Sequence, residues 1–159
     1  MNVAIPVHMR RGIFGRMVPF IIMAGKERTA FLPIDKKLYE RITAPCRQAT
    51  YLDRLAGTMH VFSEYADGLV NEPLEALLQR YPGSWAVENR DVESFSLYVG
   101  RDSSTGRLDD HYTFEIRCRR GKYKGSVDKG TNAECKAGRL REIFGERFKM
   151  DPHGPAKSE

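Results

Sequence analysis

This chain of 159 residues has few of the features that would place it in a specialised class of protein. It contains three cysteines, Cys46, Cys118 and Cys135, and none belongs to a CxxC pair. This pattern argues against a disulfide framework and favours a reducing compartment. The sequence also lacks the spacing of glycines, nucleophiles or metal ligands that is typical of a cofactor or catalytic motif. We therefore predict a protein that is not an enzyme and that uses no cofactor and no metal.

The chain also lacks a long apolar run. The longest run lies around Val18 to Ala24, is interrupted by Pro19, and is far shorter than the ~20 residues that a membrane helix needs. The first 26 residues contain four cations and no acid, but they have neither the apolar core nor the cleavage site of a secretory signal. We expect a cytoplasmic protein that does not contact a membrane, with its oligomeric state left open.

Length and composition predict one ordinary globular domain. Apolar residues make up 41% of the chain and charged residues 30%, which is typical of soluble domains. A chain of this length buries about 70% of its extended surface, so it needs no disulfide or metal to fold. We place the domain at residues 1–150. Residues 151–159 contain two prolines, one glycine and no apolar periodicity, which predicts a disordered tail.

Apolar patterns predict strands in the first part of the chain and helices after them. Residues 18–23 and 29–34 flank a glycine-containing turn and predict a hairpin. Pro19 and Pro33 cannot donate ladder hydrogen bonds, so we expect these strands at an edge of the sheet or these positions unpaired. Helical spacing then follows at three places in the sequence: from Asp35 to a break at Pro45, over residues 49–55, and from Pro73 to Tyr81.

The second half predicts a β-meander followed by a helix. Strand-like alternation covers residues 84–90, 94–99 and 112–127, and a helix is predicted over residues 131–148. Together these elements predict an α+β fold, in which an antiparallel β-sheet made of the N-terminal hairpin and the C-terminal meander packs against helices in a single domain.

The hairpin at residues 112–127 is the most informative segment. Its apolar side chains alternate with polar ones, and we place the turn at Arg120-Gly121. That turn puts Arg119 opposite Lys122 and Arg117 opposite Lys124 on the outer face. Like charges directly opposite each other destabilise a sheet by a few tenths of a kcal/mol per pair, so the pairs suggest an anionic partner.

The charge distribution favours the same interpretation. Between Arg117 and Lys149 there are eleven cations and four acids, a net charge of +7, whereas the whole chain carries +5. Such an asymmetry is typical of nucleic-acid or acidic-protein partners, although an ordinary solvated surface is the competing interpretation. The residues that we expect to bind the partner are Arg117, Arg119, Arg120, Lys122, Lys124, Tyr98, Lys136 and Arg139.

Two function hypotheses follow, from different classes. The first is a small binding protein that docks on nucleic acid or a nucleoprotein through the basic hairpin and the C-terminal helix. The alternative is an accessory protein that inhibits or modulates another protein, with the same basic face meeting an acidic surface. An enzyme without a recognisable motif comes third, and its weak candidates are a Cys46–His60 pair and the Asp109-Asp110-His111 run.

Overall fold

The computed structural model describes residues 1–11, 15–48 and 60–152, and its fold is α+β, as predicted. Eight strands form one sheet in the order β4-β3-β2-β1-β7-β6-β5-β8, and every neighbouring pair is antiparallel except β5 and β8. The strands are β1 (Val3–Arg10), β2 (Met17–Ala24), β3 (Arg28–Pro33), β4 (Trp85–Glu88), β5 (Val92–Arg101), β6 (Leu108–Cys118), β7 (Gly121–Val127) and β8 (Phe148–Asp151). The described helices are α1 (Lys36–Gln48), α3 (Val61–Asp67), α4 (Leu74–Arg80) and α5 (Ala133–Phe144), with 3-10 turns at Asn89–Asp91 and Gly145–Arg147.

The N-terminal half of the sheet is buried on both faces, which explains its nearly continuous apolar runs. Along β1, alternate residues such as Val3 and Ile5 enter a core shared with α5, whereas Ala4 enters a second core under α1, α3 and α4. The predicted hairpin of β2 and β3 is present, but both strands lie inside the sheet rather than at an edge. Pro19 and Pro33 stand near the ends of the ladder, where a missing donor costs little.

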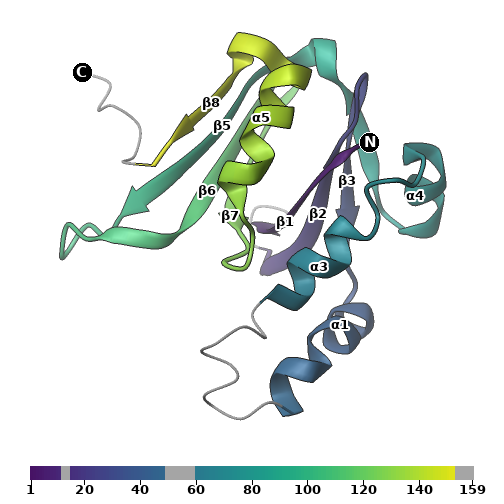
Figure 1. Cartoon of the computed structure of the whole chain (residues 1–159), viewed down its shortest axis with the longest axis horizontal. Helices are drawn as coiled ribbons and strands as arrows, with labels where there is room; N and C mark the ends of the chain where they lie inside the picture. Colours follow the sequence, from purple (N-terminus) through teal and green to yellow (C-terminus); the bar gives the residue numbers. More distant parts are fainter. Residues whose placement is uncertain (12–14, 49–59, 153–159) are drawn as a thin grey trace.

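The C-terminal half of the sheet is covered on one face. Figure 1 shows α5 crossing the sheet formed by β5, β6 and β7, and its Ala137, Leu140 and Phe144 enter the same core as Phe114 and Ile116. The meander comprises these three strands, whereas β4 pairs with β3 at the far edge. The inward phase predicted for residues 112–118 is therefore confirmed, because the alternate residues Phe114 and Ile116 are fully buried.

Helices α1, α3 and α4 cover the opposite face of β1, β2 and β3. The side chain of Asp35 caps α1 by accepting a hydrogen bond from the Leu38 amide at 2.8 Å. The predicted break at Pro45 is wrong, since α1 continues through this residue to Gln48. The helix predicted over residues 49–55 lies outside the described residues. The segment before Asp67, which the sequence left ambiguous between strand and helix, is the helix α3.

One element was missed at the C-terminus. After α5 the chain turns at Gly145, which has a φ of 60°, and enters β8, which runs parallel to β5. Sequence analysis extended the helix to Phe148, but this residue begins β8 and packs its ring against Phe95, with 5.7 Å between ring centroids. The predicted tail begins at the end of β8, and residues 153–159 lie outside the described residues.

The two halves of the sheet join where β1 meets β7, through only three paired positions. One of them sets Met9 opposite Gly125, and a Cβ atom at Gly125 would overlap the carbonyl oxygen of His8. Glycine is therefore the residue that lets these two strands approach each other. This junction also brings His8 next to the end of β7, where a pocket opens under α1 and α3.

Candidate functional site

A cavity with mostly apolar walls lies at this junction, and we call it the His8 pocket. It has a volume of about 540 Å³. Its walls come from β1, α1, α3, β7 and the segments beside them, and are mostly apolar. The lining residues are His8, Met17, Tyr39, Thr43, Cys46, Val61, Phe62, His111, Ser126, Val127, Asp128 and Lys129. Cavities of roughly 300–1,000 Å³ with apolar walls and a few polar groups are the usual form of small-molecule sites.

Three rings form one wall of the His8 pocket. The imidazole of His8 meets Tyr39 and Phe62 edge-on, at 5.9 Å between ring centroids in each case. Tyr39 and Phe62 also meet edge-on, at 5.4 Å. Edge-to-face aromatic contacts of this kind fix ring orientation and contribute about 0.5–1.5 kcal/mol each beyond area burial. The wall is therefore ordered before any ligand arrives.

A carboxylate stands beside this wall. Asp128 follows β7 directly, its amide donates to the Pro6 carbonyl oxygen at 2.8 Å, and its Oδ1 lies 3.6 Å from His8 Nε2. Burial, the charge of Asp128 and the Cys46 thiol together raise the pKa of Tyr39. The phenol therefore stays protonated at neutral pH and can donate a hydrogen bond.

A larger groove adjoins the pocket, and its lining includes several cations. It has a volume of about 910 Å³ and shares His8, Met17 and Tyr39 with the pocket, so we call it the cationic groove. Its charged lining residues are Arg11, Arg16, Lys36, Arg41, Arg80 and Asp35. Five cations and one acid thus face the same space.

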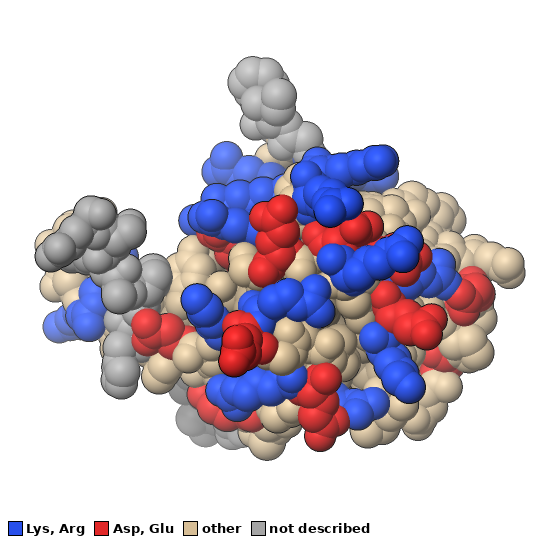
Figure 2. All heavy atoms as spheres, turned by 90° about the horizontal axis from the view of Figure 1, so that it is seen from above, with Lys and Arg blue, Asp and Glu red and all other residues tan. Residues whose placement is uncertain are grey.

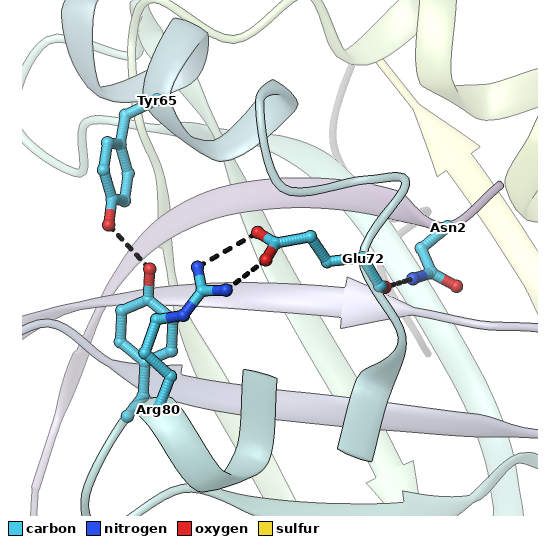
Figure 3. Close-up of polar contacts among 5 residues, drawn as sticks. Asn2, Tyr65, Glu72 and Arg80 are labelled. Carbon is cyan, nitrogen blue, oxygen red and sulfur yellow. Dashed lines mark hydrogen bonds and ion pairs between the residues drawn. The ribbon is translucent and has the colours of Figure 1, made fainter. Parts of the chain in front are cut away.

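Figure 3 shows polar contacts of Arg80 and Tyr65, two lining residues of the cationic groove. Arg80 forms an ion pair with Glu72 through both guanidinium nitrogens, one of them at 3.0 Å from the carboxylate. The hydrogen bond from Arg80 lowers the pKa of the Glu72 carboxyl. The hydroxyls of Tyr65 and Tyr81 are 2.6 Å apart, and burial together with this bond raises the pKa of Tyr81. The Tyr81 phenol therefore remains a neutral group in the wall of the groove.

The structure shifts the register of the basic hairpin by two residues. The turn is Arg119-Arg120 rather than Arg120-Gly121, so Lys124 lies opposite Glu115 and Lys122 lies opposite Arg117. No described non-glycine residue has a positive φ, and the turn does not require one. A two-residue shift preserves which face each side chain occupies, because the side-chain period of a strand is two. Instead of the two predicted like-charge pairs, the hairpin has one like-charge pair, Arg117 opposite Lys122, and one opposite-charge pair, Glu115 opposite Lys124.

The cations of the hairpin have acidic neighbours. Arg117 Nε donates to Glu115 at 2.7 Å, and Lys122 Nζ lies 3.5 Å from the same carboxylate. Partial burial would raise the pKa of Glu115, but Arg117 and Lys122 together lower it, so this acid is ionised at neutral pH. Tyr98 lies outside the hairpin, on β5, where it is opposite Thr113 of β6. Figure 2 shows cations and acids interleaved over the face seen from above.

The two predicted binding residues of the C-terminal helix, Lys136 and Arg139, do not extend the basic surface of the hairpin. Lys136 Nζ donates to the carbonyl oxygen of Ala4 at 2.6 Å and to Asp67 at 2.5 Å, so it ties α5 to β1 and α3. Arg139 donates to Glu142 at 2.7 Å and to the carbonyl oxygen of Met1 at 3.1 Å. Because α5 packs on the inner face of β5 to β7, these cations and the outward side chains of the hairpin lie on different sides of the sheet.

The residues that were weak candidates for an enzyme site make other contacts in the structure. His60 Nδ1 lies 2.8 Å from the carbonyl oxygen of Gly130. Asp110 pairs with Lys129 and His111, which lower its pKa to about 2. No group of three or more His, Cys, Asp and Glu side chains within residues 1–11, 15–48 and 60–152 could hold a metal ion. Cys46 lies in the wall of the His8 pocket.

Comparisons with known proteins identify no family. No family model matches the chain, and no curated protein matches it. A solved structure that is similar is the hSac2 domain from human phosphoinositide phosphatase Sac2, with a TM-score of 0.46 and 8% sequence identity. The match covers 99% of this chain and 79% of that chain. A likeness at this level carries no argument about what the present chain does.

The predicted function is wrong. No comparison supports nucleic-acid binding. The physical reason is that neighbours in the linear sequence separate in the fold, so the hairpin and α5 do not make one basic face. The alternative, an acidic protein surface meeting that face, depended on the same arrangement. The prediction that the chain is not an enzyme stays a prediction.

One structural finding bears on the prediction that the protein does not contact a membrane. No helix within the described part of the chain has the length and apolarity that a bilayer crossing requires.

The His8 pocket could not be recognised in the sequence because its residues are scattered over six elements, β1, β2, α1, α3, β6 and β7, and the segment after β7. One signal was available in the run Val3–Arg10, where His8 is the one ionisable side chain before Arg10 in an otherwise apolar segment. A polar residue in a strand that is buried on both faces needs a partner, and here that partner is Asp128.

Proposed function

We propose that this chain is a small-ligand-binding protein, and that its ligand occupies the His8 pocket with an apolar body against the ring wall. The observation that carries the proposal is a mostly apolar cavity of about 540 Å³ whose lining also includes a few polar side chains. Tyr39 supplies a neutral hydroxyl there, and the His8–Asp128 pair supplies donor and acceptor atoms.

The order of the wall supports the same proposal. The ring contacts among His8, Tyr39 and Phe62 hold the side chains in place, and the hydrogen bond from Thr43 Oγ1 to the Tyr39 carbonyl oxygen at 2.8 Å directs the threonine hydroxyl back toward its own helix. A preformed cavity avoids the cost of ordering side chains when a ligand binds.

The test uses N-phenyl-1-naphthylamine, a neutral apolar probe whose fluorescence rises when it leaves water. The wild-type protein should bind it at one site, and Thr43→Trp should fill the cavity and weaken binding at least about tenfold, which corresponds to 1.4 kcal/mol. Glu40→Trp is the matched control, because Glu40 is exposed on the same helix and does not line the pocket.

Two results would count against the proposal. One is a wild-type protein that gives no saturable fluorescence increase. The other is an equal loss of affinity in Thr43→Trp and Glu40→Trp, with both variants unfolding cooperatively, because this would place the probe elsewhere.

A further inference from the structure

We propose that the ligand is an amphipathic anion, whose apolar chain occupies the His8 pocket and whose phosphate, sulfate or carboxylate head lies in the cationic groove. This inference rests on the proposed function and names the chemical class of the ligand. The two cavities share His8, Met17 and Tyr39 as lining residues and therefore adjoin each other, and the proposal requires one molecule to span both.

The charge of the cationic groove is not balanced by its own residues. Asp35, the one acid in its lining, already accepts a hydrogen bond from the amide of Leu38 at the start of α1. Arg80 is paired with Glu72. The remaining four cations form no ion pair with any residue in the described ranges; they are Arg11, Arg16, Lys36 and Arg41. Like charges around one concave space raise its potential and attract an anion.

Among the lining residues of the His8 pocket, in contrast, Lys129 and Asp128 balance each other in charge. Lys129 Nζ donates to Asp110 at 2.8 Å, and Asp128 lies against His8. An anionic head would therefore gain little in the pocket and much more in the groove, where charge-assisted hydrogen bonds to unpaired cations are available. The apolar part of the ligand has the opposite preference, because the pocket is the apolar side of the combined space.

Two sources can supply such a ligand, namely a free single-chain anion or an anionic headgroup at a lipid surface. Both present the same chemistry to Lys36 and Arg41, which lie on α1 at the rim of the groove. Calorimetry should therefore compare octyl phosphate, 1-octanol and inorganic phosphate, together with phosphatidylcholine vesicles that contain phosphatidate.

We expect octyl phosphate to bind at least about tenfold more tightly than 1-octanol, which lacks the charged head, and than inorganic phosphate, which lacks the apolar chain. The double variant Lys36→Gln/Arg41→Gln should lose about tenfold of the octyl phosphate affinity and keep its affinity for 1-octanol. The matched control is Lys37→Gln/Arg107→Gln, which removes the same charge from exposed residues outside the pocket and the groove and should bind as the wild type does.

The outcomes distinguish a failure of the amphipathic-anion inference from a failure of the proposed small-ligand function. If vesicles bind and the binding depends on Lys36 and Arg41, the source is a lipid surface; if only octyl phosphate binds, the source is a free anion. If 1-octanol binds and the phosphate adds nothing, or if both double variants lose affinity equally, the amphipathic anion is refuted and the apolar pocket stands. If neither octyl compound binds, the proposed function falls as well.

Discussion

Replacing Gly125 with alanine should separate the two halves of the sheet. A Cβ atom there would overlap the carbonyl oxygen of His8 and lie 2.9 Å from both Met9 Cβ and a ring carbon of Phe114. Two of these three neighbours are backbone or Cβ atoms that no rotamer change can move, so β1 and β7 must move apart. Only three paired positions join these strands, and the change falls at one of them.

The magnitude follows from two costs. Overpacking a tight core costs about 1–3 kcal/mol, and each ladder hydrogen bond weakened costs about 0.5–1.5 kcal/mol. The free energy of unfolding should therefore fall by roughly 2–4 kcal/mol, and Tm by roughly 5–15 °C for a domain of this size. Urea unfolding followed by circular dichroism measures the first value, and calorimetry measures the second.

Gly121 provides the control for this variant. It begins the same strand, has negative φ, and a Cβ atom there would meet nothing within 4 Å. Gly121→Ala should therefore change the free energy of unfolding by no more than about 0.5 kcal/mol. Equal unfolding midpoints for Gly125→Ala and Gly121→Ala would refute the close approach of β1 and β7.

Three further predictions concern the core, a thiol and a carboxylate. Leu140→Ala should lower the free energy of unfolding by about 2–5 kcal/mol in urea titrations because Leu140 is fully buried, and Leu108→Ala, at an exposed position, should be nearly neutral. Cys118 should react with iodoacetamide more slowly than exposed Cys135, since burial and nearby Asp91 and Glu93 raise the pKa of the Cys118 thiol; equal rates would contradict this. The carboxyl of Asp110 should titrate near its pKa of about 2 by NMR and move toward its ordinary value in Lys129→Gln. Its small contribution to stability should be complete above the unfolded-state pKa and disappear as the pH falls through about 2, and no change in Lys129→Gln would contradict the pairing.

The sequence located the strands and helices of this fold better than it identified how the strands pair. Apolar alternation located the hairpin of β2 and β3 and the inward phase of β6, because a period of two is a local property. The hairpin register was wrong by two residues, because Gly121 looked like the turn residue although Arg119-Arg120 turns without a positive φ. The short strand β8 was missed because four residues carry too little periodicity.

The candidate site could not be predicted in the same way. His8 and Asp128 are 120 positions apart, and the pairing of β1 with β7 brings them together only after the sheet is complete. The cations of the hairpin stood out in the sequence because they are close together, but Glu115 pairs with two of them in the fold. Lys36 and Arg41, in contrast, gave no sequence signal, because their isolation from acids is a property of the folded groove.

The most direct test of the account is an amide NMR titration of the full chain with octyl phosphate. We expect saturable shifts at residues of the pocket and the groove, above all His8, Lys36, Tyr39 and Val127, with the outer face of the hairpin unchanged. Shifts that concentrate at residues 117–124 and leave His8 and Tyr39 unmoved would contradict it.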